Sequence, residues 1–462
     1  MDVRRGETIE LSVEKVVYGG RGLAHLNNMA IFVANTVPGD RVIAKVVRTK
    51  KNFAEARILE VIEASPHRII APCPYSDFCG GCTWQCIEYE KQLEYKHALV
   101  AELLNHIGMV TDFTMHPTLP SSQIFEYRNK MEFSFSDRRW LLPKERDEKK
   151  DNNSFALGLH VPGTFDKIID IEGCLLQKEK GNEILREAKR YIRESGMPVY
   201  GLKTHKGFWR YLMLRHSYSF DEWMVNIITS ETRDAPIQVL SSILKDKFNE
   251  IATVVNNINT KKGGTAVGEW EKVFAGEGYI KDKIGTLTFE ISANSFFQTN
   301  TLMAERLYQS VKDFASLTGR ETIFDLYSGI GTISTFLASQ AARIIGVDIS
   351  NAAIADAKRN CQLNGIDNCE FFCGDVKMFL SQFRIQPDVL IADPPRVGMH
   401  RGVIDRILRL LPKRIIYISC NPSTLARDVA LLKEGYTLEE VKPIDLFPHT
   451  YHIETVARLE RN

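Results

Sequence analysis

From about residue 280 onward, short apolar runs alternate with longer amphipathic stretches, and this alternation constrains the fold more than any other feature. Five runs are typical of buried strands: TIFDLYSG (322–329), ARIIGVDIS (342–350), CEFFCGD (369–375), PDVLIADPP (387–395) and RIIYISCNP (414–422). A helix-like stretch follows each run, so consecutive strands need crossover connections and run parallel. TLEEVKPIDLF and HIETVARLER follow as an antiparallel pair. The pattern predicts an α/β fold with a doubly wound, Rossmann-like sheet and helices on both faces.

Two regions with other patterns precede this sheet. Residues 1–63 alternate polar and apolar positions in several short runs separated by turn residues, which is typical of a small OB-like β-barrel. Residues 64–275 mix strand-like and helix-like stretches, among them an amphipathic helix over 88–108 that ends at a glycine. We therefore expect three domains: a barrel (1–63), a mixed α+β central domain (64–275) and the parallel-sheet domain (276–462).

The composition limits the partners and the compartment. Charged residues make up 25% of the chain and the net charge is +1, so the protein as a whole does not attract a polyanion. Any nucleic acid must then be bound by local patches. The amino terminus is polar and no apolar run is long enough to cross a bilayer, which predicts a cytoplasmic protein without membrane contact. In that compartment we expect the 9 cysteines to be reduced.

Cations gather on two parts of the chain. The third and fourth strands of the expected barrel carry few acids and six cations: Arg41, Lys45, Arg48, Lys50, Lys51 and Arg57. They indicate either solvated strand faces or a surface that follows an RNA backbone. Cations are interleaved with aromatic residues in two further stretches, FEYRNKMEFSF (125–135) and GFWRYLMLRHS (207–217). These stretches are either ordinary sheet or surfaces on which bases stack. The charge run KERDEKKDNN (144–153) is expected to be a solvated hairpin tip.

The first strand-to-helix turn of the parallel sheet suggests a cofactor pocket. Gly329 and Gly331 lie there, but the third glycine of Gly-x-Gly-x-x-Gly is missing, which argues against a pyrophosphate ligand. The second strand ends at Asp348, whose carboxylate can accept both ribose hydroxyls. The third strand ends at Gly374-Asp375, placed to reach an adenine edge. An adenosine pocket without a phosphate cradle favours S-adenosylmethionine over NAD.

The fourth and fifth strand ends indicate the reaction chemistry. The fourth ends Asp393-Pro-Pro-Arg396, where many amino-methyltransferases place an aromatic residue after the prolines; the Pro-Cys typical of cytosine-5 enzymes is also missing. Cys420, at the end of the fifth strand, is either a small core residue or a nucleophile beside the cofactor. Gln298, in ISANSFFQTN before the first strand, is either a surface amide or a contact to the cofactor or base.

Cysteines cluster near the start of the central region. Cys73, Cys79 and Cys82 are spaced as C-x5-C-x2-C, and Cys174 is a distant fourth. A zinc site usually has two C-x2-C pairs, whereas only one occurs here, so an iron–sulfur cluster is favoured over zinc or unliganded thiols. Cys86 is spare. Three further cysteines in the parallel-sheet region are expected to be structural: Cys361, Cys369 and Cys373.

The combination of a barrel, C-x5-C-x2-C with a distant Cys, SFFQTN, DLYSGIG, DPPR, SCNP and a late H-x-E resembles the RNA uracil-5-methyltransferases. The barrel, called a TRAM domain there, and the four cysteines resemble the ribosomal RNA branch, since the transfer RNA branch typically lacks both. The resemblance implies that Cys420 is the nucleophile and Glu454 the base that removes the C5 proton. It also implies further roles by position: a cofactor pocket of Gln298, Tyr327, Asp348 and Asp393, and [4Fe-4S] ligands Cys73, Cys79, Cys82 and Cys174.

The expected function is methyl transfer from S-adenosylmethionine to C5 of a uridine in 23S ribosomal RNA, through a covalent bond between the cysteine and C6. The partner would be ribosomal RNA, and the protein is expected to be a monomer. Two alternatives stay open. One is the same chemistry on transfer RNA, and the other is a non-catalytic RNA-binding assembly factor.

Overall fold

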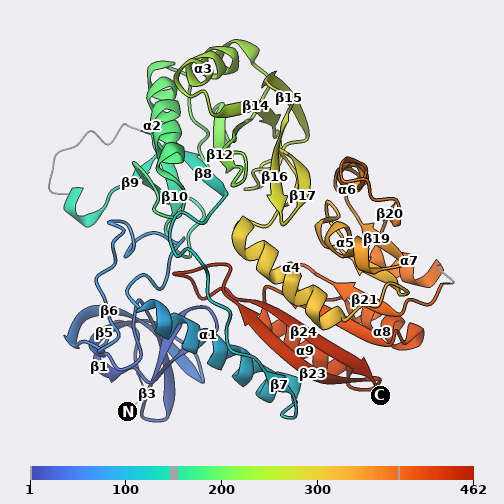
Figure 1. Cartoon of the computed structure of the whole chain (residues 1–462). Helices are drawn as coiled ribbons and strands as arrows, with labels where there is room; N and C mark the ends of the chain where they lie inside the picture. Colours follow the sequence, from blue (N-terminus) through green and yellow to red (C-terminus); the bar gives the residue numbers. More distant parts are fainter. Residues whose placement is uncertain (1–2, 146–154, 383–384) are drawn as a thin grey trace.

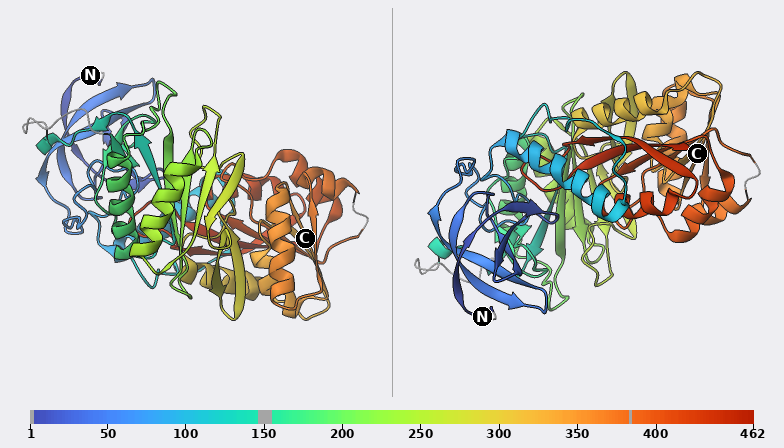
Figure 2. Two further views of the ribbon diagram at one scale, coloured as in Figure 1. Left: turned by 90° about the horizontal axis from the view of Figure 1, so that it is seen from above. Right: turned by 90° about the horizontal axis from the view of Figure 1, so that it is seen from below.

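A computed structural model of the chain describes residues 3–145, 155–382 and 385–462. Most of the predicted hairpin tip at 144–153 lies outside the described residues. Three large sheets follow one another along the chain and form three lobes (Figure 1). The two further views in Figure 2 show the amino-terminal sheet and the carboxyl-terminal sheet at opposite ends of the molecule. No helix among the described residues is both long and apolar enough to span a bilayer.

The amino-terminal lobe is a curved six-stranded sheet with the order β1-β5-β6-β4-β3-β2. Its strands are β1 (Thr8–Ser12), β2 (Lys15–Val17), β3 (Arg21–Leu26), β4 (Met29–Ala34), β5 (Arg41–Thr49) and β6 (Phe53–Glu63). Polar and apolar positions alternate in the first part of β5, so Val42, Ala44 and Val46 lie in the core while Arg41 and Lys45 are exposed. This confirms the alternation predicted for residues 1–63.

The middle lobe is built on an eight-stranded sheet with the order β15-β14-β13-β12-β8-β10-β11-β9. Its strands are β8 (Lys130–Ser136), β9 (Arg139–Trp140), β10 (Ala156–His160), β11 (Ile168–Asp170), β12 (Trp209–His216), β13 (Trp223–Thr229), β14 (Ile251–Ile258) and β15 (Trp270–Ala275). Helices α2 (Glu179–Glu194) and α3 (Asp234–Lys247) pack on it, as does the hairpin β16 (Tyr279–Ile284)–β17 (Leu287–Ser292). Every residue of β12 and β13 is buried, because both faces of the sheet are covered.

The carboxyl-terminal lobe is an eight-stranded sheet with the order β20-β19-β18-β21-β22-β24-β23-β7. Its strands include β18 (Thr322–Leu326), β19 (Arg343–Asp348), β20 (Cys369–Cys373), β21 (Val389–Ala392), β22 (Arg414–Ser419), β23 (Tyr436–Ile444) and β24 (Glu454–Arg461). The helices are α4 (Thr301–Ala315), α5 (Thr332–Leu337), α6 (Asn351–Leu363), α7 (Val376–Gln382), α8 (Arg401–Leu410) and α9 (Pro422–Leu432). The first five strands are parallel and β24 is antiparallel to both its neighbours, as the alternation predicted.

One part of the carboxyl-terminal lobe comes from far earlier in the chain. Helix α1 (Tyr89–Leu103), the π-turn Leu104–Gly108 and β7 (Thr114–Met115) pack along β23 and α9 (Figure 2, right). Strand β7 pairs in parallel with β23, and His116 Nε2 hydrogen-bonds Glu440 Oε2 at 2.6 Å. The sheet is therefore completed by residues of the predicted central domain, whose limits stay a prediction.

Candidate active site

The register of two neighbouring strands brings Cys420 and Glu454 together. Strands β22 and β24 are antiparallel, and Ser419 pairs with Thr455. The next position on each strand is therefore the pair Cys420 and Glu454, which lie side by side at the carboxyl end of β22. The Glu454 side chain is deeply buried, with 4% of its surface exposed, while Cys420 is half-buried.

A second carboxyl and an arginine complete this cluster at the end of β21. Burial and the nearby Asp393 raise the pKa of Glu454 well above its usual range, and Arg396 opposes the shift. The pKa of the Cys420 thiol is raised to about 11, first by burial and then by Glu454; Asp393 adds to the shift, and Arg396 lowers it. Arg396 is therefore the cation that favours the thiolate form of Cys420, whereas Glu454 and Asp393 disfavour it.

Asp393 is itself shifted by a carboxyl that the sequence did not single out. Its pKa is raised to about 7 by burial and by the nearby Asp325. Asp325 lies inside β18 and is fully buried; its Oδ2 accepts a hydrogen bond from Ser334 Oγ at 2.5 Å. Its Oδ1 has no hydrogen-bond partner among the described residues. The sequence signal for Asp325 is a single acidic residue in the apolar run TIFDL, because an isolated carboxyl in a buried strand is rare without a partner or a functional role.

The turn from β18 into α5 forms the floor of the predicted cofactor pocket. Tyr327 has a φ of 64°, a strained value for a residue with a side chain. Gly331, with a φ of 75°, must lack a Cβ, because one would come within 2.9 Å of the Phe371 ring. The Gly329 N–H donates to Asp348 Oδ2 at 3.0 Å, and the Ser350 N–H donates to Oδ1 at 2.8 Å. Asp348 is thus held in a fixed orientation at the end of β19.

The remaining predicted pocket residues lie on two other segments. Asp375 Oδ1 accepts from the Met378 N–H at 3.0 Å and so caps the start of α7. Burial and the nearby Asp375 raise the pKa of Tyr327 to about 12, so these two predicted residues lie close to each other. Gln298 is buried, and its main-chain oxygen accepts from Asn129 Nδ2 at 2.8 Å. The loop that carries Gln298 is therefore fixed by the middle lobe.

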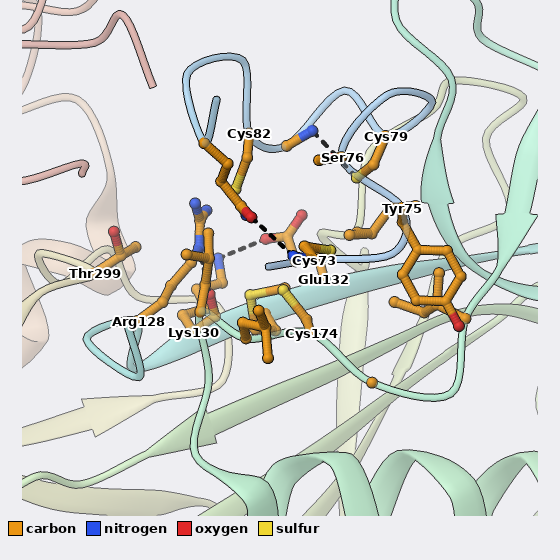
Figure 3. A pocket seen from close by; sticks show the side chains of 18 residues that line it. Cys73, Tyr75, Ser76, Cys79, Cys82, Arg128, Lys130, Glu132, Cys174 and Thr299 are labelled. Carbon is orange, nitrogen blue, oxygen red and sulfur yellow. Dashed lines mark hydrogen bonds and ion pairs between the residues drawn. The ribbon is translucent and has the colours of Figure 1, made fainter. Parts of the chain in front are cut away.

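Cys73, Cys79, Cys82 and Cys174 line a single cavity of about 260 Å³, separate from the Cys420 cluster (Figure 3). Burial raises the pKa of all four thiols, to about 12 for Cys82 and about 11 for Cys174. In the described part of the chain, no three His, Cys, Asp or Glu side chains are grouped closely enough to hold a single metal ion. Cys86 does not line this cavity. Thr299, next to Gln298, does line it.

Comparisons with known proteins identify the family of the chain. The family model described as tRNA (Uracil-5-)-methyltransferase matches residues 243–462, and the TRAM domain model matches residues 2–59. An uncharacterized RNA methyltransferase of Chlorobaculum tepidum is 41% identical over 99% of this chain and 97% of its own length. The chain belongs to the RNA uracil-5-methyltransferase family. A second relative of this family, an uncharacterized RNA methyltransferase of Porphyromonas gingivalis, is 41% identical over 96% of the chain and 98% of its own.

A solved structure of this methyltransferase family supports the cofactor. The tRNA (uracil-54, C5)-methyltransferase of Pyrococcus abyssi, in complex with S-adenosyl-L-homocysteine, is 29% identical with a TM-score of 0.75. The match covers 97% of this chain and 99% of that one. The predicted parallel-sheet methyltransferase fold and the amino-terminal TRAM domain are confirmed. The protein is an S-adenosylmethionine-dependent RNA methyltransferase, whereas the roles of individual site residues stay predictions.

Proposed function

We propose that this enzyme methylates C5 of a uridine in 23S ribosomal RNA through a covalent bond between Cys420 and C6 of the base. The observation that carries the proposal is the register of β22 and β24, which sets Cys420 beside Glu454. This chemistry needs a nucleophile and a base within reach of adjacent atoms of one ring, and neighbouring ladder positions on two strands meet that need.

The reaction proceeds in three steps on this arrangement. The Cys420 thiolate, favoured by Arg396, adds to C6 and moves electron density onto C5. C5 then attacks the sulfonium methyl; the sulfur–methyl bond breaks and S-adenosylhomocysteine leaves. The C5 atom now carries a methyl group and a proton, and Glu454 removes the proton so that the Cys420–C6 bond can break. Burial raises the affinity of Glu454 for that proton, which suits a base.

The cofactor would lie across the carboxyl ends of β18, β19 and β20. Asp348 is proposed to accept the ribose hydroxyls, because its backbone hydrogen bonds hold it in place and leave further lone pairs on both oxygens. The neighbouring Ile349 side chain is exposed and apolar, which suits contact with an adenine ring. Four further residues are proposed to line the pocket: Gln298, Tyr327, Asp375 and Asp393.

We also propose that the cysteine cavity holds a [4Fe-4S] cluster with four ligands, Cys73, Cys79, Cys82 and Cys174. The support is that four cysteines from two segments, two of them buried and two half-buried, line one cavity. One zinc ion needs its sulfurs about 2.3 Å from a common centre, whereas a cluster takes one thiolate at each iron. When bound, the cluster would supply positive charge that stabilises the four thiolates and cross-links the two segments.

Transfer RNA is the second candidate substrate, and a specific observation favours it. The Pyrococcus abyssi enzyme is described as a tRNA methyltransferase, and its match covers nearly all of this chain, the barrel included. A barrel therefore does not by itself distinguish a ribosomal from a transfer RNA substrate. The case for 23S RNA then depends on the cysteine set.

Mapping 5-methyluridine in RNA from cells with and without the gene tests the proposal. Loss of the modification from 23S RNA alone supports it, and loss from transfer RNA alone selects the second candidate. If both RNAs keep all their 5-methyluridine, the protein is not the methyltransferase for either, and both candidate substrates are wrong.

A further inference from the structure

The turn between β2 and β3 carries a tyrosine from the barrel to the Cys420 cluster. Tyr18 begins this turn, and its ring packs perpendicular to that of Tyr451, with 5.8 Å between the ring centroids. Burial raises the pKa of Tyr18 to about 12; Tyr451 and Cys420 raise it too, while Arg396 lowers it. Tyr18 is therefore within electrostatic reach of the same arginine and thiol that form the candidate active site.

The position of Tyr18 is fixed by contacts on both sides of the turn. Gly20 has a φ of 79°, and a Cβ there would come within 2.8 Å of Tyr451 Cδ1, so the turn lies tightly against Tyr451. Trp84 Nε1 donates to the Gly20 carbonyl at 3.2 Å. Tyr451 in turn contacts the ring of His452, with 4.2 Å between centroids, two residues before Glu454. The barrel turn and the loop before β24 thus form one rigid edge.

Tyr18 remains accessible, with 37% of the residue's surface exposed. In a perpendicular pair, one ring meets the face of the other with its edge, so the pair does not by itself cover both faces of either ring. Val397, which follows Arg396, is also strongly exposed. An exposed aromatic ring held rigidly beside a cation and a nucleophile is a site where an RNA base can stack.

We propose that Tyr18, seated on Tyr451, stacks the nucleobase next to the target uridine while that uridine lies in the Cys420 pocket. The inference rests on the proposed function, since extruding the uridine removes the stacking partner of its neighbour. A base-sized platform at the pocket mouth replaces that partner. The TRAM domain would then bind the reacting strand itself and not only distant phosphates.

Four variants separate stacking from other roles. Tyr18→Ala removes the ring, Tyr18→Phe keeps it without the hydroxyl, and Tyr218→Ala removes a tyrosine of similar exposure, 40%, in the middle lobe. Tyr18→Leu keeps the apolar contact with Tyr451 if the alanine variant fails to fold. Each variant is first checked for unchanged S-adenosylhomocysteine binding and melting temperature.

The substrate is an RNA with 2-aminopurine on either side of the target uridine, and quenching of its fluorescence reports stacking. In wild type, binding should quench one of the two flanking positions. Tyr18→Ala should abolish that quenching and raise the KM for RNA by about 5- to 100-fold, with kcat at saturating RNA nearly unchanged. Tyr18→Phe should restore both, and Tyr218→Ala should behave as wild type.

Two results would overturn the stacking role. One is equal behaviour of Tyr18→Ala and Tyr218→Ala; the other is a Tyr18→Phe variant as impaired as Tyr18→Ala, because the hydroxyl would then matter and not the ring. Failure of the proposed function is distinguishable, since wild type would then form no 5-methyluridine in 23S RNA. The quenching assay needs no methyl transfer and would still decide whether Tyr18 stacks a base.

Discussion

Lys96 and Asp445 form an ion pair across 349 residues of sequence, with 2.6 Å between Nζ and Oδ1 and both side chains fully buried. Lys96 lies on α1, and Asp445 begins the loop that leads from β23 to Glu454. Burial lowers the pKa of Lys96, and Asp445 opposes that shift. Tyr89 Oη also donates to Asp445, at 3.0 Å. The loop before the proposed base is thus anchored to α1 by a desolvated charge pair.

Replacing Lys96 by methionine should lower the free energy of unfolding by about 3–5 kcal/mol, because the Asp445 carboxylate would be left buried and unpaired. Urea denaturation at neutral pH measures this. The control is Lys91→Met, whose partner Glu94 is exposed and whose effect should stay below about 0.5 kcal/mol. Equal effects of the two variants would show that the buried pair does not anchor the loop.

Cys420 and Glu454 should fail at different steps. Cys420→Ala should abolish both methylation and covalent RNA adducts, since no thiolate attacks C6. Glu454→Gln should transfer one methyl group and then accumulate a denaturant-resistant protein–RNA complex, because the C5 proton stays in place. Denaturing gels with labelled RNA and labelled methyl donor measure both. Normal turnover by Cys420→Ala would return that thiol to a packing role.

The pH dependence of the reaction should be set by the shifted groups beside Cys420. The deprotonated forms of Cys420 and Glu454 are the reactive ones, and both pKa values are raised, that of Cys420 to about 11. The kcat/KM should therefore increase as the pH rises above neutrality. Arg396→Gln removes the group that lowers the pKa of Cys420, so its profile should shift to higher pH, and Arg396→Lys should shift it less. A profile that falls above pH 8 in wild type would contradict this order.

Cys79 should matter for folding before it matters for chemistry. Protein purified without air should contain about four irons and four sulfides per chain. Cys79→Ala should lose iron and melt at lower temperature, because the two cavity segments lose their cross-link. Cys86→Ala is the matched control, since Cys86 lies outside the cavity wall. One zinc per chain, without iron or sulfide, would exclude the cluster.

The exposed cations at the end of β5 should contribute to RNA affinity. Replacing Arg48, Lys50 and Lys51 together by alanine should weaken RNA binding. The slope of log K against log salt concentration should become less steep, by the equivalent of up to about three phosphate contacts. Binding of S-adenosylmethionine should not change. The matched control neutralises three exposed cations of the carboxyl-terminal lobe, Arg401, Arg409 and Lys413. An unchanged slope for the barrel variant would mean that β5 is a solvated face.

Features with a local signal were predictable from the sequence, and features made by distant pairing were not. The strands β18 to β22 follow from apolar runs whose crossovers force a parallel order. Strand β7 has only two residues, too few to show a hydrophobic periodicity, so its pairing with β23 could not be predicted from the sequence. The helical stretch predicted over 88–108 does end at Gly108, but Gly108 is not the residue that takes the left-handed conformation at its end. A π-turn follows α1, and Met109, not Gly108, takes the left-handed conformation with a φ of 51°.

The candidate site likewise has residues that were predictable from the sequence and residues that were not. Cys420, Asp348 and Asp393 stand at strand ends, where position in the sequence implies position in the fold. Tyr18 lies more than 400 residues before Cys420, and nothing near it in the sequence marks it as a neighbour of that thiol. Its place depends on how the barrel turn packs against Tyr451.

The pairing of β7 with β23 also has a consequence for biosynthesis. His116 is made 324 residues before Glu440, its hydrogen-bond partner, so α1 and β7 leave the ribosome long before the sheet that they complete. Until α9 and β23 emerge, the apolar side of α1, with Val100 buried in the final core, lacks its partners within the lobe. The chain therefore carries an exposed helix face through most of its translation, and a nascent chain stalled before residue 422, where α9 begins, should be a preferred client of ribosome-associated chaperones.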